Sequence, residues 1–223
     1  MSDTNKYGMT SWDDPAPVSG NKPNRKDSWI KLKNGSNVIR CITDPYRYIT
    51  HNFKEEGDSG IGEKINCSKP LHGTCPICSK PGKENAPKMR WYLGVIDRET
   101  DTAKIMDVGP FVYKAILALT RDADYGSPTK YDIDIKVNKE GGPTGYYTVI
   151  PKPPKAMTAN DINHQASFDV EGLQKRCTPL DLVSIQEKID AYRTKRGHKV
   201  EKAQVEDVSF DQESGTVLFP NAD

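Results

Sequence analysis

The spacing of apolar positions along the chain predicts a protein built mainly of β-strands. Between residues 28 and 53, short apolar runs alternate with polar residues, as is typical of half-buried strands. Residues 29–32 and 38–42 flank the turn Asn34-Gly35 and predict a hairpin. Residues 46–53, which are rich in aromatic and β-branched side chains, predict a third strand after Asp44-Pro45.

A second set of strands follows a long polar segment. The expected strands are residues 89–96, 103–108, 131–137 and 146–150. A helical pattern begins at Pro110, a favourable first-turn residue. In the strand at 131–137 the alternation places four side chains on one face: Tyr131, Ile133, Ile135 and Val137. Five to seven short strands with one interrupting helix favour an OB-fold, a five-stranded Greek-key barrel. An SH3-like barrel and a β-sandwich are the alternatives.

Changes in composition predict how the chain is organised. Residues 1–26 resemble a flexible arm, and residues 27–155 the barrel core, with a polar loop at 54–88 that needs something to hold it. Residues 156–200 predict a helical extension after the Pro-rich segment at 151–155. Within it, we expect a helix with Thr178 as N-cap, Pro179 at the first position and Asp181 at the third. Residues 201–223 resemble an acidic, disordered tail.

The near-zero net charge of +1 conceals an uneven distribution. Residues 22–54 carry eight Lys or Arg against two Asp, whereas residues 206–223 carry five acidic residues and no Lys or Arg. Such asymmetry suggests nucleic-acid binding combined with an interaction tail, although both segments could equally be ordinary solvated surface. The balance excludes a uniformly basic, histone-like protein.

The sequence shows neither a membrane-spanning run of apolar residues nor the apolar region of a secretory signal. Hydrophobic residues make up 35% of the chain, and the mean hydropathy is −0.72. Three of the five cysteines lie between residues 67 and 78. Without secretion, this clustering favours a metal site in a reducing compartment over a disulfide framework.

The candidate metal site combines Cys67 with the pair Cys75 and Cys78, whose spacing lets one turn supply two thiolates. Two histidines could provide the fourth ligand. His72 lies inside the same loop, whereas His51 lies on the preceding strand, where packing and a second hydrogen bond hold a ring more easily. The strand position favours His51. Four protein ligands would fill a tetrahedral Zn²⁺ shell, so we expect one structural, non-catalytic ion.

Cations and aromatic rings alternate in three of the expected strands. Cations neutralise phosphates and rings stack on unpaired bases, so this mixture favours binding of single strands without strong sequence preference. The candidate residues are Trp29, Lys31, Lys33, Arg40, Tyr46, Arg47, Tyr48, Arg90 and Tyr92. Trp91 is flanked by Met89 and Leu93 at a spacing of two and is expected in the core.

These segments resemble the zinc-containing single-stranded-DNA-binding proteins of tailed bacteriophages, of the T-even helix-destabilising type. The resemblance is carried by WIKLKNGSNVIRCI, YRYITHNF, Cys67, CPIC, RWYLGVIDRETD and YTVIPKPP. The family order of His, Cys and Cys-x-x-Cys implies His51, Cys67, Cys75 and Cys78 as zinc ligands within an OB-fold. It also implies an acidic tail that contacts replication and recombination proteins and competes with DNA, here with Asp211, Glu213, Leu218 and Phe219.

We therefore expect a non-enzymatic protein that binds single-stranded DNA during phage replication, recombination and repair in the cytoplasm of the infected bacterium, without membrane contact. An enzyme is disfavoured, because neither a His-x-Glu pattern nor a phosphate-binding loop is present. The alternative is a zinc-stabilised adaptor between proteins of the replication machinery, with its aromatic residues buried.

Overall fold

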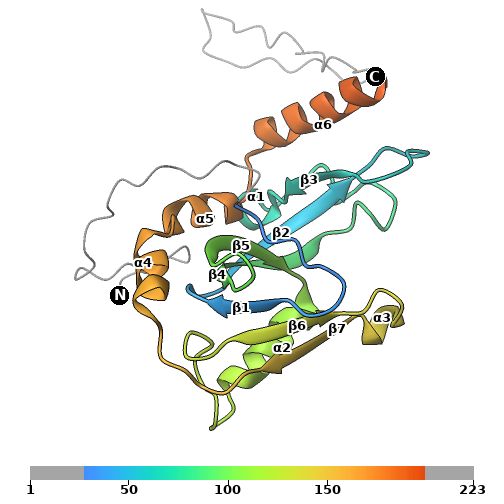
Figure 1. The fold of residues 1–223 in the computed structure, drawn as a ribbon. Coiled ribbons are helices and arrows are strands. Elements are labelled where there is room, and N and C mark those ends of the chain that lie inside the picture. Colours follow the sequence, from blue (N-terminus) through green and yellow to red (C-terminus); the bar gives the residue numbers. More distant parts are fainter. Residues whose placement is uncertain (1–27, 199–223) are drawn as a thin grey trace, which may run out of the picture.

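The computed structural model describes residues 28–198 and shows a mainly β fold with a seven-stranded antiparallel sheet (Figure 1). The expected arm at 1–26 and tail at 201–223 lie outside these residues. The strands are β1 (Val38–Cys41), β2 (Tyr46–Phe53), β3 (Glu63–Asn66), β4 (Lys88–Asp97), β5 (Thr102–Val108), β6 (Ile133–Val137) and β7 (Tyr147–Pro151).

The long strand β4 organises the sheet. One edge of β4 pairs with β5, while the other edge pairs with β2 near its start and with β1 near its end. From Trp91 to Asp97 every residue of β4 is buried, because the strand is covered on both faces. The sheet continues from β2 to β3 and from β1 to β6 and β7, so it is open, with β3 and β7 at its ends.

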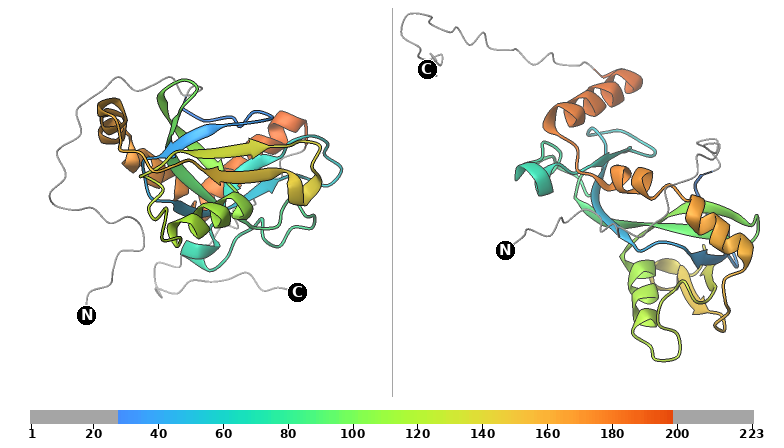
Figure 2. Two further views of the ribbon diagram at one scale, coloured as in Figure 1. Left: turned by 60° about the horizontal axis from the view of Figure 1, so that its bottom comes forward. Right: turned by 90° about the vertical axis from the view of Figure 1, so that its left-hand side faces the viewer.

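Six helices accompany the sheet in the described part of the chain: α1 (Lys69–His72), α2 (Pro110–Thr120), α3 (Gly142–Gly145), α4 (Ala159–Ser167), α5 (Val170–Cys177) and α6 (Leu182–Arg196). Helix α2 lies on the opposite side of the sheet from α4 and α5 (Figure 2). The ring of Phe168, between α4 and α5, lies so close to Gly94 of β4 that a Cβ atom there would be 2.7 Å from it.

The main core lies between the sheet and α2. Its buried residues are Ile39, Cys41, Trp91, Leu93, Val95, Met106, Val108, Val112, Ile116, Tyr131, Ile133 and Ile135. Trp91 is in the core, as expected, and its ring stacks on Tyr113 with 4.0 Å between centroids. The apolar side of the predicted alternation at 131–137 is confirmed, because Tyr131, Ile133, Ile135 and Val137 are all buried, but Asp134, expected on the polar face, is buried as well.

The predicted hairpin around Asn34-Gly35 is wrong. Residues 29–35 form no strand; instead Trp29 pairs with Ile105 of β5, and Gly35 pairs with Val137 of β6. The segment therefore crosses from one part of the sheet to another, and β1 pairs with β4 and β6. Partners distant in sequence outweigh the local turn signal.

The helix expected to begin at Thr178 also starts elsewhere. Thr178 ends α5, and Asp181 is the N-cap of α6, where its carboxylate accepts a hydrogen bond from the backbone N–H of Ser184. Asp and Thr are both favourable N-caps, so the sequence contained two candidate starts. Within its described residues, 156–198, the predicted extension contains three helices, of which α4 and α5 were not predicted individually.

Candidate metal centre and the surrounding surface

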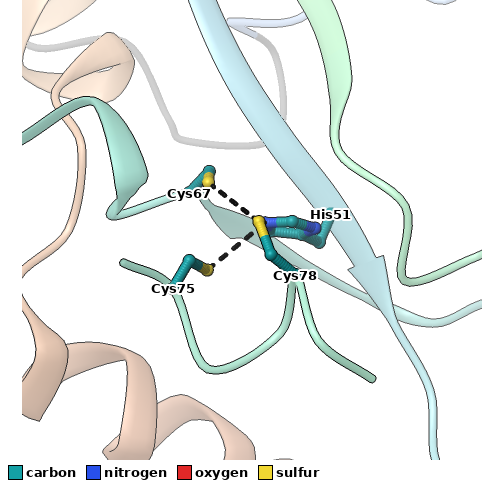
Figure 3. A group of neighbouring side chains, drawn as sticks. All are labelled: His51, Cys67, Cys75 and Cys78. Atoms are coloured by element: carbon teal, nitrogen blue, oxygen red, sulfur yellow. Dashed lines mark hydrogen bonds between the residues drawn. The ribbon is translucent and has the colours of Figure 1, made fainter. Parts of the chain in front are cut away.

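Four side chains from the loop and the preceding strand converge on one point. The ligand atoms of His51, Cys67, Cys75 and Cys78 all lie within 4.8 Å of one another, and the group could hold one metal ion (Figure 3). His51 Nε2 is 3.5 Å from the sulfur of Cys75 and 3.8 Å from that of Cys78. The sulfurs of Cys67 and Cys78 are 3.7 Å apart. These are the four residues predicted from the sequence.

The ring of His51 is fixed by β2 and by the end of the loop. His51 is fully buried, and its Nδ1 lies 2.7 Å from the main-chain carbonyl of Asn85. If Nδ1 carries the proton, that N–H donates to the carbonyl and the lone pair of Nε2 faces the sulfurs. Burial lowers the pKa of His51 and favours the neutral ring, which is the form that binds metals.

The cysteines are held by a tight local turn. Cys67 follows β3, and the Ser68 hydroxyl donates to the carbonyl of Thr74, closing the short segment that contains α1. Gly73 adopts a left-handed conformation with φ of 71°, which ends α1 and turns the chain toward Cys75. The Cys78 N–H then donates to the Cys75 carbonyl.

The cysteine thiols have opposite electrostatic environments. Burial raises the pKa of Cys67 and of Cys78. Burial acts in the same direction on Cys75, but backbone hydrogen bonds, including those from Ile77 and Cys78, outweigh it and lower the Cys75 pKa. Cys75 is thus the thiol most easily converted to a thiolate ligand.

His72, the second histidine considered from the sequence, lies outside this group. It is exposed at the last position of α1. The support that Asn85 gives to His51 is not predicted from the sequence. Asn85 is buried, and its side chain bonds to the backbone of Lys54 and to the carbonyl of Pro81. Asn85 lies 34 positions after His51, so no local sequence pattern connects the two residues.

The aromatic candidates converge on one face of the sheet. Trp29 meets Tyr92 edge-on at 5.2 Å, and Tyr48 stacks on Tyr92 at 4.2 Å. Tyr46 packs against the same cluster, which includes Leu173 of α5. However, only 2% of Tyr48 and 5% of Tyr92 is exposed, so the expectation that these rings form an open stacking surface is wrong. Helix α5, which the sequence pattern had not revealed, covers them.

A polar network borders this aromatic cluster. The Lys64 ammonium donates to the hydroxyls of Tyr48 and Tyr92 and pairs with Asp107. The Arg90 guanidinium donates to the same carboxylate at 2.7 Å. Lys64 was missed because it lies on β3, a strand inside the segment expected to be a loop. Arg90 lies two positions before Tyr92 on β4, and its guanidinium is already paired with Asp107.

Arg40 corrects the predicted binding set. Its side chain is 1% exposed; it donates to Asp132 at 2.6 Å and to the carbonyl of Lys155 at 2.9 Å. A guanidinium in this position anchors the segment after β7 and is not available to a ligand. Arg47 is exposed but lies on the face of β2 opposite to Tyr46 and Tyr48.

Trp29, Lys31 and Lys33 line an open groove with a volume of about 660 Å³. The groove lies between residues 29–38 and the turn that joins β4 to β5. Lys33 pairs with Glu99 in a largely exposed contact. Arg98 and Lys104 also line the groove, but they are paired with acidic side chains that are mostly buried.

The predicted tail residues Asp211, Glu213, Leu218 and Phe219 lie outside the described residues. Among the helices of residues 28–198, none combines the length and the apolar character that crossing a membrane requires. When the chain is compared with known proteins, no protein-family model and no curated protein matches it.

Proposed function

We propose that this protein binds single-stranded DNA with little sequence preference, and so protects and organises it during phage replication, recombination and repair. The observation that carries the proposal is the groove where Trp29, Lys31 and Lys33 meet. The Trp29 ring is half-buried, with Tyr92 edge-on to it and the Arg176 guanidinium 5.7 Å from its centroid, and its groove side would be the part that contacts a base. The exposed ammonium groups of Lys31 and Lys33 lie beside it, where they can neutralise phosphates. The weak surface pair between Lys33 and Glu99 can give way to a phosphate at small cost.

The order of the elements supports an OB-fold for the part of the molecule that carries the groove. The hairpin β4–β5 is followed by α2 and then by the hairpin β6–β7, and β1 pairs with a strand of each hairpin. Five strands with one helix in this arrangement are compatible with a partly open Greek-key barrel. The metal loop is then an insertion between its first two strands.

We further propose that the metal is Zn²⁺ and that its role is structural. In a tetrahedral zinc site, bond lengths of about 2.3 Å to sulfur and about 2.0 Å to nitrogen imply edges of about 3.8 Å between sulfurs and about 3.5 Å between sulfur and nitrogen. The sulfur–sulfur distance of 3.7 Å and the nitrogen–sulfur distances of 3.5 and 3.8 Å support this assignment. His51, Cys67, Cys75 and Cys78 would fill the shell, which leaves no position for a substrate and argues against catalysis.

The remaining parts of the proposal rest on the sequence. Residues 206–223, with Asp211, Glu213, Leu218 and Phe219, would contact replication and recombination proteins in the cytoplasm of the infected bacterium. A second candidate function is a zinc-stabilised adaptor between proteins. The burial of Tyr48 and Tyr92 favours it, because those rings then stabilise the fold.

Titration of the full-length protein with oligo-dT at several salt concentrations, followed by tryptophan fluorescence, tests the proposal. The variant Lys31→Ala/Lys33→Ala should bind more weakly. The slope of log K against log salt should decrease by about 1.4, because each phosphate that is no longer neutralised lowers it by about 0.7. Lys188→Ala/Lys195→Ala, which removes two exposed lysines of α6, is the matched control. Absence of oligo-dT binding by the wild-type protein would favour the adaptor instead.

A further inference from the structure

Helix α6 packs directly on the metal loop. One apolar cluster, which we call the α6–loop cluster, joins them; its buried members are Phe53, Ile65, Cys67, Cys75, Ile77, Ile185, Ile189 and Tyr192. Ile77 lies between the ligands Cys75 and Cys78 and is fully buried. The candidate ligands Cys67 and Cys75 and the neighbouring Ile77 thus belong to the same cluster as the inner face of α6, and Cys78 packs against it.

Polar contacts attach the end of α6 to the same loop. The Tyr192 hydroxyl donates to Asp58 at 2.7 Å, and the Arg193 guanidinium donates to Glu55 at 2.7 Å. Beyond the helix, His198 contacts Asp58 at 2.9 Å. Together with Arg196, which donates to the carbonyl of Ile61, these side chains all reach residues 55–61.

The main core is separate from this arrangement. It is formed by the sheet and α2, and it shares no residue with the α6–loop cluster. The loop itself is rich in Gly, Pro, Lys and Asn, so it has few apolar side chains with which to fix its own conformation. The position of Ile77 therefore depends on what holds Cys75 and Cys78.

We propose that occupancy of the metal site controls the docking of α6. A cation bound by Cys75 and Cys78 fixes the turn between them and presents Ile77 to Ile185 and Ile189. When the cation is lost, Ile77 is no longer held, and α6 separates from the loop while the sheet and its main core stay folded. The inference rests on the proposed metal site and is independent of DNA binding.

The coupling is reciprocal, because a contact that metal binding strengthens must in turn strengthen metal binding. Weaker packing of α6 should therefore accelerate metal release. Ile189→Ala truncates a buried side chain on α6 without touching a ligand, and Val183→Ala makes a similar truncation at a position of α6 that is 70% exposed. Zn²⁺ transfer from Ile189→Ala to a chromogenic chelator should be faster by on the order of tenfold, and from Val183→Ala unchanged.

Hydrogen exchange of the full-length protein provides the direct test, with zinc content measured in the same samples. On chelation of the metal, amide protection in α6 should fall by on the order of tenfold, while β4 to β7 remain protected. Ile77→Ala should lower α6 protection while the metal is still bound; if that variant does not fold, the metal-release rates of Ile189→Ala and Val183→Ala decide. Protection of α6 that survives chelation, or loss of protection throughout the sheet, would overturn the inference, whereas purified protein without metal would overturn the metal site itself.

Discussion

The Nδ1 atom of His51 lies 2.7 Å from the main-chain carbonyl of Asn85, and this contact joins strand β2 to the end of the metal loop. The carbonyl is itself held in place, because the Asn85 side chain donates to the carbonyls of Lys54 and Pro81 and accepts from the Lys54 N–H. Orientation of the His51 ring thus depends on a residue that contributes no ligand.

Replacing Asn85 should therefore weaken metal binding without removing a ligand. We expect Asn85→Ala to lower the affinity for Zn²⁺ by about tenfold to a hundredfold, as is typical when the support of a ligand is removed. Competition with a chromogenic chelator measures the affinity. Asn52→Ala, at an exposed position on β2, is the control and should leave the affinity unchanged.

The two histidines of the segment make a matched pair of variants. His51→Ala should abolish stoichiometric metal binding and destabilise the loop and α6 more than the sheet, because the proposed structural metal is lost. His72→Ala should retain the metal and the stability, since His72 is exposed on α1. Elemental analysis and thermal unfolding test both; metal loss in His72→Ala would contradict the ligand assignment.

Arg40 should contribute to the stability of the protein and not to its affinity for DNA. Arg40→Ala leaves Asp132 paired with Arg98 alone and the Lys155 carbonyl without this donor, and should cost about 1–3 kcal/mol in the free energy of unfolding. At temperatures where the variant is folded, its affinity for oligo-dT should match that of the wild type. A specific decrease of affinity in folded Arg40→Ala would show that this residue takes part in binding after all.

Asp161, the third residue of α4, should make the stability of the protein depend on pH. Hydrogen bonds from Arg98 hold the pKa of Asp161 at about 2, compared with 3.8 for the unperturbed group. Because the folded state favours the carboxylate, the contribution is complete above pH of about 4 and is lost as the pH falls through about 2. This difference in pKa corresponds to about 2 kcal/mol.

Denaturant unfolding between pH 2 and 7 measures this contribution. The stability difference between the wild type and Asp161→Asn should be largest at neutral pH and should shrink toward pH of about 2. Asp44→Asn, at an exposed position, should show no such trend. A difference that stays constant across the range would mean that Asp161 acts through its shape and hydrogen bonds and not through its charge.

The metal group was predictable because its information is local. Cys75 and Cys78 share one turn, and the alternation on β2 and β6 marks strands without reference to the rest of the chain. Whether an individual cation or ring is buried depends on residues that are distant in the sequence. Arg40 is buried because Asp132, 92 positions later, pairs with it, and Tyr92 is buried because α5 covers its face of the sheet.

The hairpin expected around Gly35 failed for a related reason. Its sequence fits a two-stranded turn, but residues 29–35 find partners on β5 and β6 instead. Strand pairing depends on which side chains become buried together, and this is decided only when distant segments meet. The same dependence explains why β3 was not predicted, since this short strand has β2 as its one partner among residues 28–198.

The span of the metal loop has a consequence for the synthesis of the protein. All four candidate ligands lie between residues 51 and 78, whereas the pairing of β1 with β6 must await residue 133, where β6 begins. Closing the shorter loop costs about 1 kcal/mol less in chain entropy than joining β1 to β6. During translation from the N-terminus, the loop can gather its ligands before the hairpin β6–β7 has left the ribosome. Cellular zinc supply would thus act on the nascent chain, well before α6, the last helix of the described residues to be made, can join it.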